Sequence, residues 1–261
     1  MTVSLPAPDY VPPHGLLAGR RVVITAAAGA GIGSAVALRC LEEGAELVVI
    51  GDTHEGRLEA SRAELAERFG EDRVSAVVCD VTVEEQIGRL LDAADGFDVM
   101  INNAGLGGEV SILDMTDEQW SKVLDITLTG TFRCIRAAGR RWVESGTRGV
   151  MVNNASVIGW RAQEGQAHYA AAKAGVMALT RSAAKDLAAH GIRVNAVSPS
   201  LAMHPFLAKV TTPEKLEELT SREAFGRAAE PWEVANVMVF LSSEYSSYMT
   251  GEVVAVSSQH A

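Results

Sequence analysis

Aromatic residues and cysteine are scarce in this chain. Phe, Trp and Tyr together make up 5% of the 261 residues, and the three cysteines are Cys40, Cys79 and Cys134. Their wide spacing contains no Cys-x-x-Cys and no Cys/His ligand pattern, which disfavours a disulfide framework and a zinc site. We therefore expect three buried, reduced thiols, no metal and a cytoplasmic location.

Basic charge and long apolar runs are also lacking. Lys and Arg total 23 against 33 Asp and Glu, a net charge of −10. This balance argues against binding to nucleic acid or to an anionic membrane surface, because both need a basic face. No apolar run approaches the ~18 residues of a membrane helix. Residues 1–19 contain four prolines and no basic start before an apolar stretch, so they predict a surface arm rather than a signal peptide.

The rest of the chain predicts one α/β domain over residues 20–261. Short, nearly all-apolar runs alternate with longer stretches of helical spacing, which is typical of strands covered by helices on both faces. Such units, connected right-handed, build a Rossmann-like, doubly wound parallel sheet, here of about seven strands. The predicted strands are 22–25, 47–50, 74–78, 97–102, 149–154, 192–197 and 252–256. The main predicted helices are 32–43, 55–69, 83–94, 118–144, 166–189 and 233–242.

Two helix starts have the spacing of a capping box, Thr82 with Glu85 and Thr116 with Gln119. Between the sixth strand and the last helix, residues 199–231 carry little strand signal. Their length and position predict a lid over a substrate site.

A glycine-rich turn follows the first strand: Thr25-Ala-Ala-Ala-Gly29-Ala-Gly31-Ile32-Gly33. Its glycines would let the backbone approach a pyrophosphate, and the helix that begins at Ile32 would direct its first N–H groups at the phosphates. The flanking strand and helix, and an acidic residue nineteen positions past Gly33, favour a dinucleotide site. The alternative is a tight turn without a ligand.

That acidic residue, Asp52, follows the second strand. A carboxylate here can hydrogen-bond the adenosine ribose and would repel a 2′-phosphate, which favours NAD over NADP. His54 and Arg57 are near in sequence and leave NADP open. Asp52 could instead begin the turn into the next helix, because Asp is a common turn residue.

Two further segments end strands at the same edge of the predicted sheet. Asp80 and Val81 follow the third strand and are placed to meet the adenine, although Asp80 could equally be a loop carboxylate ahead of a helix. Asn103, Ala104 and Gly105 follow the fourth strand, where small residues let the backbone lie against a ribose or the nicotinamide. Asn and Gly are also ordinary turn formers, so either role could dominate.

Three residues carry the expected acid–base chemistry. Ser156 ends the fifth strand, Tyr169 follows on a predicted helix, and Lys173 comes four residues later. An i,i+4 pair shares one face of a helix, so the ammonium can approach the phenol. A phenol titrates near 10, and a nearby ammonium together with a nicotinamide cation would favour the phenolate. We therefore expect Tyr169 to be a general acid/base.

With Asn195-Ala-Val-Ser-Pro199, these motifs resemble the short-chain dehydrogenase/reductase family over residues 17–256. The resemblance implies hydride transfer between a nicotinamide dinucleotide and a secondary alcohol or ketone. It implies that Tyr169 is the general acid/base, that Ser156 holds the substrate oxygen and that Lys173 also grips the nicotinamide ribose.

The same resemblance places Pro199 at the cofactor. It also implies a homo-oligomer, with a tetramer favoured, formed through the predicted helices 118–144 and 166–189.

The sequence departs from the family pattern at four places. Ala26 stands where the glycine turn usually has its first Gly, and the turn holds one more residue than usual. Thr127 aligns with the helical Asn of the family's proton relay. After the sixth strand stand Ser200 and, by position, His204, in place of a Gly and of a Thr that meets the nicotinamide. The tail reads Val256-Ser-Ser-Gln-His rather than Val-Asp-Gly-Gly.

Residues 25–33, 153–161 and 225–235 are similar to a subgroup of the family from actinobacterial steroid breakdown. That resemblance implies a hydroxyl of a two-ring steroid remnant, carried as a CoA thioester, as the small-molecule substrate. Trp160 and Arg161 would line the cleft, with Arg161 suited to an acidic ester, although a solvated surface Arg is an equal alternative. Two other functions stay open: a 3-oxoacyl-thioester reductase using NADPH, and a non-catalytic dinucleotide-sensing protein.

Overall fold

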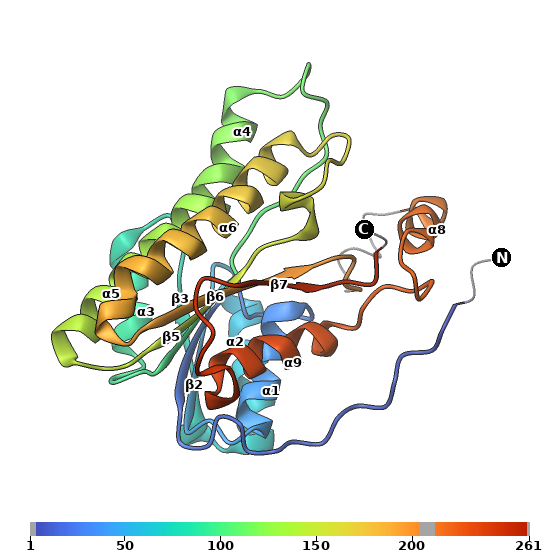
Figure 1. Ribbon diagram of the computed structural model, residues 1–261. Coiled ribbons are helices and arrows are strands. Elements are labelled where there is room, and N and C mark those ends of the chain that lie inside the picture. Colours follow the sequence, from blue (N-terminus) through green and yellow to red (C-terminus); the bar gives the residue numbers. More distant parts are fainter. Residues whose placement is uncertain (1–3, 204–211, 260–261) are drawn as a thin grey trace.

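The computed structural model describes residues 4–203 and 212–259. In that part of the chain, seven parallel strands form one sheet in the order β3-β2-β1-β4-β5-β6-β7 (Figure 1). This confirms the predicted doubly wound sheet, and every strand boundary lies within two residues of its predicted place. The strands are β1 (Arg21–Thr25), β2 (Leu47–Asp52), β3 (Val74–Val78), β4 (Val99–Asn102), β5 (Val150–Asn154), β6 (Arg193–Pro199) and β7 (Val253–Val256).

The direction of strand addition reverses at β1. The chain places β2 and β3 on one side of β1 and then returns to place β4 on the other side, so β1 pairs with both β2 and β4. In open parallel sheets a ligand crevice lies at the carboxyl ends of the strands at such a reversal. The turn after β1 and the segment after β4 border this crevice.

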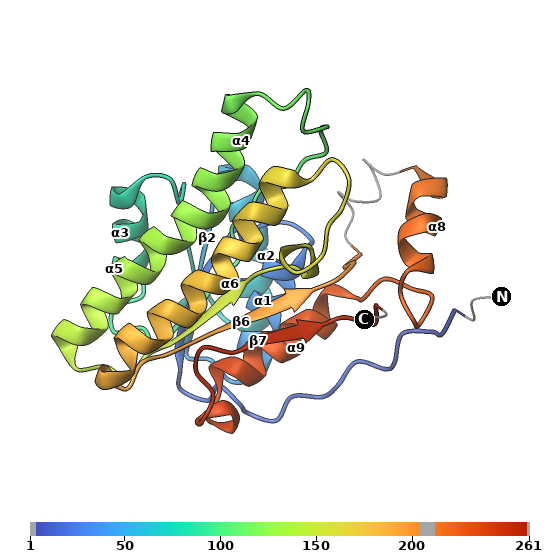
Figure 2. The same cartoon turned by 45° about the horizontal axis from the view of Figure 1, so that its top comes forward.

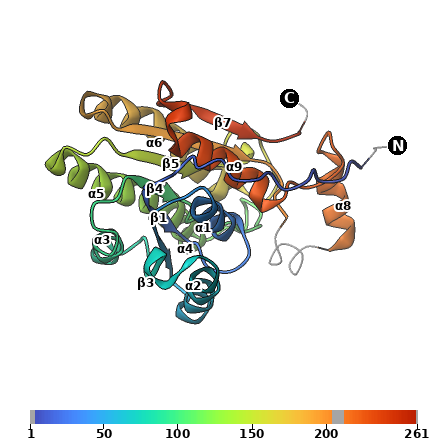
Figure 3. The same ribbon diagram turned by 90° about the horizontal axis from the view of Figure 1, so that it is seen from below.

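Helices cover both faces of the sheet because its strand residues are apolar on both sides. Side chains alternate along a strand, so Val22 and Ile24 pack on one face and Val23 on the other. The first face is covered by α1 (Ile32–Glu42), α2 (Glu55–Phe69) and α9 (Pro231–Ser242), as the view from below shows (Figure 3). The second face is covered by α3 (Glu84–Asp92), α5 (Gly130–Ser145) and α6 (Ala167–Leu187).

Two local expectations differ from the structure. The predicted helix over 118–144 is interrupted: α4 (Asp117–Leu124) passes into a π-helical turn, η2 (Asp125–Thr129), before α5 begins. The capping box at Thr116 is confirmed, but the one at Thr82 is wrong. The Thr82 hydroxyl donates instead to Asp80, and Val83 is the N-cap of α3. A side chain that can cap a helix can also bond a nearer carboxylate, and here the carboxylate wins.

The remaining elements are short. Helix α8 (Pro213–Ser221) lies in the 199–231 segment and stands apart from the sheet (Figure 2). The 3-10 helices are η1 (Glu71–Arg73), η3 (Val157–Gly159), η4 (Ala188–His190) and η5 (Glu244–Ser246). None of the helices in the described ranges is long and apolar enough to cross a membrane. The three cysteines are buried and unpaired, as expected.

The described part of the N-terminal arm, from residue 4 onward, runs along the outer side of α1 and α9 (Figure 3). Arg39 of α1, 3% exposed, donates hydrogen bonds to the carbonyl oxygens of Val11 and Pro12. It also pairs at 2.6 Å with the fully buried Glu43. The arm is therefore held to the domain by a buried ion pair.

Candidate active site

The predicted site residues lie in one row along the carboxyl edge of the sheet. Two carboxylates occupy one end of the row, the glycine turn its middle, and the acid–base residues the other end. This is the order in which an extended dinucleotide would meet them, with its adenosine over the first strands of the row. From β3 across to β6, the strands are followed or ended by Asp80, Asp52, the glycine turn, Asn103, Ser156 and Pro199.

The glycine turn leaves little room for side chains on its inner side. Ala26 and Gly29 both have positive φ, at 53° and 89°. A methyl group on Gly33 would lie 2.2 Å from the carbonyl oxygen of Ala26, whereas one on Gly31 would meet nothing within 4 Å. Gly33 thus lets the turn close on itself, while the space beside Gly31, the N-cap of the helix that starts at Ile32, stays open. This cradle fits a phosphate group.

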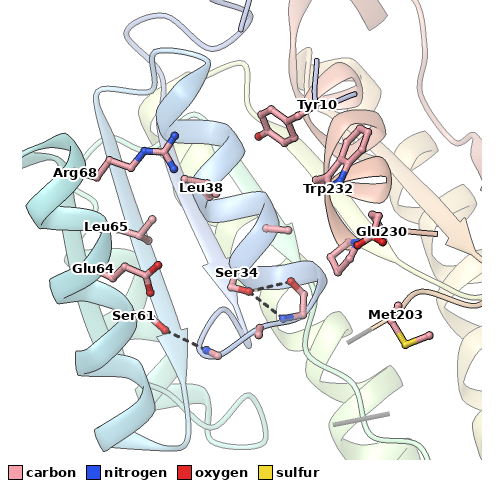
Figure 4. A pocket seen from close by; sticks show the side chains of 15 residues that line it. Tyr10, Ser34, Leu38, Ser61, Glu64, Leu65, Arg68, Met203, Glu230 and Trp232 are labelled. Carbon is pink, nitrogen blue, oxygen red and sulfur yellow. Dashed lines mark hydrogen bonds between the residues drawn. The ribbon is translucent and has the colours of Figure 1, made fainter. Parts of the chain in front are cut away.

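A cavity of about 670 Å³ borders the outer side of this turn (Figure 4). Its floor is α1, and its walls are α2 on one side and, on the other, Tyr10 of the arm with Trp232 of α9. Ser61 of α2 accepts a 3.1 Å hydrogen bond from the Gly29 N–H, and Ser34 exchanges two hydrogen bonds with Gly31. These bonds hold the turn from outside, and the cavity is not lined by the acid–base residues.

Asp52 stands beside the glycine turn. Its carboxylate accepts hydrogen bonds from the N–H groups of Ala28, at 3.3 Å, and His54, at 3.0 Å. The exposed Arg57 guanidinium lies 4.0 Å away. Asp52 therefore begins the turn into α2 and at the same time borders the cradle, so the two interpretations of this residue are compatible.

Asp80 is engaged within its own loop. Its Oδ1 accepts hydrogen bonds from the N–H and the hydroxyl of Thr82, both at 2.8 Å, which is the pattern of an Asx turn. Val81 is buried against Gly130 of α5. Adenine contacts of Asp80 and Val81 therefore stay a prediction.

Asparagine side chains tie the strand ends together. Asn103 donates 2.8 Å to the Ala26 carbonyl oxygen and accepts 2.9 Å from Asn154, which joins the ends of β1, β4 and β5. The hydroxyl of Thr25 accepts the N–H groups of Asn103 and Ala104, at 3.0 and 3.1 Å. Sequence reasoning had not assigned this role to Thr25, because a terminal strand residue gives no sign of its distant partners.

Ser156, Tyr169 and Lys173 come together where β5 meets α6. Ser156 is the N-cap of η3, and the other two lie one turn apart on α6. The Ser156 hydroxyl is near enough to the Tyr169 phenol to lower the pKa of that phenol. Nζ of Lys173 lies 5.6 Å from the centroid of the Tyr169 ring and donates a 2.5 Å hydrogen bond to the carbonyl oxygen of Asn154. A substrate ketone or alcohol could therefore place its oxygen next to the Ser156 hydroxyl and the Tyr169 phenol.

Burial dominates the electrostatics of the phenol and the ammonium. It raises the pKa of the Tyr169 phenol, and the neighbouring Ser156 hydroxyl opposes that rise. Burial also lowers the pKa of Lys173 to about 8. Desolvation is the largest cause of both shifts. The expectation that the ammonium and a nicotinamide cation together make the phenol acidic stays a prediction.

Thr127 lies fully buried in the π-helical turn. Its hydroxyl accepts the Leu106 N–H at 3.0 Å and donates to the Leu106 carbonyl oxygen at 3.3 Å. Gly105, the residue before Leu106, packs against Lys173, since a methyl group on Gly105 would lie 3.2 Å from Nζ of Lys173. Thr127, which stands in the place of the relay Asn, therefore donates its hydroxyl hydrogen to the segment after β4. This bond holds that segment against Lys173.

Two further candidates can be placed. His168, beside Tyr169, is buried, and its Nδ1 accepts the Tyr169 N–H at 2.9 Å, so this nitrogen carries no proton for transfer. His204 lies outside the described residues.

Comparison with known proteins decides the family. Residues 26–258 match a family model described as enoyl-(acyl carrier protein) reductase. The crystal structure of a short chain dehydrogenase from Mycobacterium smegmatis is 53% identical, with a TM-score of 0.86, over 98% of this chain and 99% of that chain. This chain belongs to the short-chain dehydrogenase/reductase family. It is an oxidoreductase, and its cofactor is a nicotinamide dinucleotide.

Two other members of the family bear on substrate and cofactor. The (5R,7aS)-5-hydroxy-7a-methyl-1-oxo-2,3,5,6,7,7a-hexahydro-1H-indene-carboxyl-CoA reductase of Mycobacterium tuberculosis is 57% identical over 258 residues, 97% of this chain and 98% of the relative. A 3-oxoacyl-[acyl-carrier protein] reductase from Brucella melitensis, crystallised with bound NAD, is 31% identical, with a TM-score of 0.88 over 97% of each chain. The short-chain dehydrogenase/reductase family inferred from the motifs is thus confirmed.

Proposed function

We propose that the protein transfers hydride reversibly between NAD(H) and a ring carbon of a two-ring steroid remnant carried as a CoA thioester. The observation that carries this proposal is the 57% identity, over 97% of the chain, to the M. tuberculosis reductase named for such a substrate. The Ser156–Tyr169–Lys173 group supports a reaction that interconverts a secondary alcohol and a ketone.

Tyr169 is the proposed proton carrier. In the oxidative direction it takes the proton of the substrate hydroxyl, and in the reductive direction it returns one to the ketone oxygen. The bound nicotinamide supplies the carbon that accepts or donates hydride. Ser156, whose hydroxyl lowers the pKa of the phenol, holds the substrate oxygen, and Lys173 places positive charge beside the ring. A phenol whose pKa burial raises stays protonated at neutral pH, which suits the acid role in ketone reduction.

NAD is the proposed form of the cofactor. The Asp52 carboxylate borders the cradle and would repel a 2′-phosphate. Arg57, 4.0 Å from Asp52, is the nearest described cation on α2 that could offset this repulsion. The proposed cofactor-binding residues are Gly29, Gly31, Ile32, Gly33, Asp52, Asp80, Val81, Asn103, Ala104, Gly105, Tyr169, Lys173 and Pro199.

The test is an assay of the purified protein with the bicyclic keto-thioester, a short 3-oxoacyl-CoA and a simple cyclic ketone, each with NADH and with NADPH. The loss of reduced-nicotinamide absorbance measures turnover. We expect the highest kcat/KM for the bicyclic thioester with NADH. No turnover of any substrate, with NADH binding retained, would instead identify a dinucleotide-sensing protein.

The second candidate is a 3-oxoacyl-thioester reductase that uses NADPH. The fold similarity to the B. melitensis 3-oxoacyl reductase favours this reductase activity, whereas the NAD in that structure does not bear out the use of NADPH. A higher kcat/KM for the straight-chain thioester than for the bicyclic one would decide for this activity, and the two cofactors are compared in the same assay.

A homotetramer is the proposed assembly. A groove of about 400 Å³ between α5 and α6 is lined by the exposed Phe132 and Val143 and by the small residues Gly139 and Ala183. Apolar side chains beside small ones suit close contact with the same face of a second copy. Phe132→Glu should therefore lower the mass measured by light scattering, whereas Leu113→Glu, on an exposed loop elsewhere, should not.

A further inference from the structure

Glu223, in the segment after α8, has a carboxylate that is almost wholly buried, with 2% of the residue exposed. Its Oε2 accepts the hydroxyls of Ser200, at 3.1 Å, and Ser258, at 2.8 Å. Its Oε1 accepts the Leu201 N–H, at 3.3 Å, and the Gln259 side-chain amide, at 3.1 Å. Each carboxylate oxygen thus accepts one hydrogen bond from the segment after β6 and one from the C-terminal tail.

These partners are uncharged. Among the described residues, none of the ion pairs includes Glu223, so four neutral donors compensate for the removal of its charge from water. Three of those donors, Ser200, Ser258 and Gln259, lie in the two places where the end of β6 and the tail depart from the family pattern. The two departures from the family pattern therefore come together at the Glu223 carboxylate.

The hydrogen bonds continue toward β5. The Oε1 atom of Gln259 accepts Nη1 of Arg161 at 2.9 Å, so this amide bridges Arg161 and Glu223. Arg161 follows η3, the short helix whose N-cap is Ser156. A chain of side-chain bonds therefore runs from the segment after β5, through the tail, to the segment after β6.

The backbone reinforces this junction. The Ala224 N–H donates to the Ser258 carbonyl oxygen at 2.6 Å, and Glu223 forms an isolated antiparallel bridge with Gln259. None of these contacts reaches the glycine turn or Asp52, which belong to β1 and β2 at the other end of the row.

We propose that Glu223 is a positioning residue for the substrate. By accepting four hydrogen bonds it holds the segments that follow β5 and β6 in fixed relation to one another, and these segments border the acid–base end of the site. It acts through the geometry of these four hydrogen bonds and not through its charge. The inference rests on the proposed function, because its main readout is the KM for the keto-thioester.

The test compares three substitutions with a matched control. Glu223→Ala leaves four donors without their acceptor, so the KM for the thioester should rise about tenfold, while kcat and the NADH dissociation constant stay within about threefold of wild type. Glu223→Gln keeps every contact, since its amide nitrogen can donate to the two serine hydroxyls and its oxygen can accept the other two bonds, so its KM should stay near wild type. Gln259→Ala should raise KM by less, and Glu217→Ala, on the exposed face of α8, should change nothing.

A double variant tests the chain of bonds. Because Glu223 and Gln259 act in one network, Glu223→Ala with Gln259→Ala should be no worse than Glu223→Ala alone. The proposal is overturned by a Gln variant as defective as the Ala variant, by a loss confined to kcat, or by additive losses in the double variant.

Hydrogen exchange separates this inference from the proposed function. If wild type does not reduce the thioester, the proposed function fails, but faster exchange of the Leu201 and Ala224 amides in Glu223→Ala and not in Glu223→Gln still supports the positioning role. Equal exchange in all three proteins overturns it. Should Glu223→Ala fail to fold, Gln259→Ala and Ser200→Ala carry the same measurements.

Discussion

The ammonium of Lys173 donates its hydrogen bond to the backbone of Asn154 and not to the phenol of Tyr169. A buried cation thus fastens α6 to the end of β5. Its pKa falls to about 8 because burial disfavours the charged form. The charge that the family uses beside the phenol is therefore kept at a cost in folding stability, and that cost depends on pH.

Lys173→Met should reveal this dependence. The unfolded chain holds the lysine proton up to about pH 10.5 and the folded chain only to about pH 8, so the unfolded state binds more protons between these values. The free energy of unfolding of wild type, relative to the Met variant, should therefore increase across this window, by up to about 3 kcal/mol. Chemical denaturation of both proteins at several pH values measures the difference. The buried cysteines are common to both and cancel, and a difference that does not change with pH would contradict the prediction.

Tyr169→Phe should remove the proton carrier and leave the cradle intact. We expect kcat to fall by about a thousandfold, within the range of general acid–base catalysis, while NADH affinity stays within about twofold. Tyr248→Phe, a fully exposed tyrosine, is the matched control. Steady-state kinetics and a fluorescence titration with NADH give the two quantities, and full activity of the Tyr169→Phe variant would refute the role of the phenol.

The two glycines of the cradle should respond differently to one added methyl group. Gly33→Ala places it 2.2 Å from the Ala26 carbonyl oxygen, so the melting temperature and NADH affinity should both fall. Gly31→Ala meets no protein atom within 4 Å, so the fold should be kept. The methyl would stand in the open space of the cradle, and NADH affinity should fall about tenfold or more. Calorimetry with and without NADH distinguishes them, and unchanged affinity in the Gly31→Ala variant would place the phosphates elsewhere.

Asp52→Ser should shift the choice of cofactor. Without the carboxylate the repulsion of a 2′-phosphate is lost, and kcat/KM for NADPH should rise relative to NADH by about tenfold or more. The single oxygen of Ser can still accept the His54 N–H that Asp52 accepts now, which keeps the turn into α2. Glu55→Ser removes a neighbouring charge from the first turn of α2 and serves as control. An unchanged ratio would mean that Asp52 only shapes the turn.

The sheet could be predicted from sequence because its signal is local. Buried parallel strands are short apolar runs, and the helices between them have apolar residues at helical spacing. Each element can therefore be recognised from its own residues alone. The break at Asp125–Thr129 escaped prediction because a single π-helical turn inside a longer helix gives too small a disturbance to be read from the apolar pattern. Thr82 was misassigned because its hydroxyl had two possible partners a few residues apart.

The site was predictable in part for the same reason. Glycines, Asp52 and the Tyr169–Lys173 pair are recognised by spacing along the chain. The pKa of Tyr169 was not, because it depends on how completely the phenol is buried, and burial is a property of the folded protein. Glu223 was missed because its partners at residues 200–201 and 258–259 come together only in three dimensions.

The hydrogen bonds of Arg39 and Glu43 to the N-terminal arm bear on how the protein should be produced for experiments. Glu43 accepts the backbone N–H groups of His14 and Leu16, both at 2.9 Å, while Arg39 binds carbonyl groups just upstream. Trimming the chain to the start of β1 would expose an ion pair that now has almost no contact with water. A recombinant protein that starts at β1 would thus have water in the place of the arm along α1 and α9. Catalytic measurements made on that truncated protein would not describe the full chain.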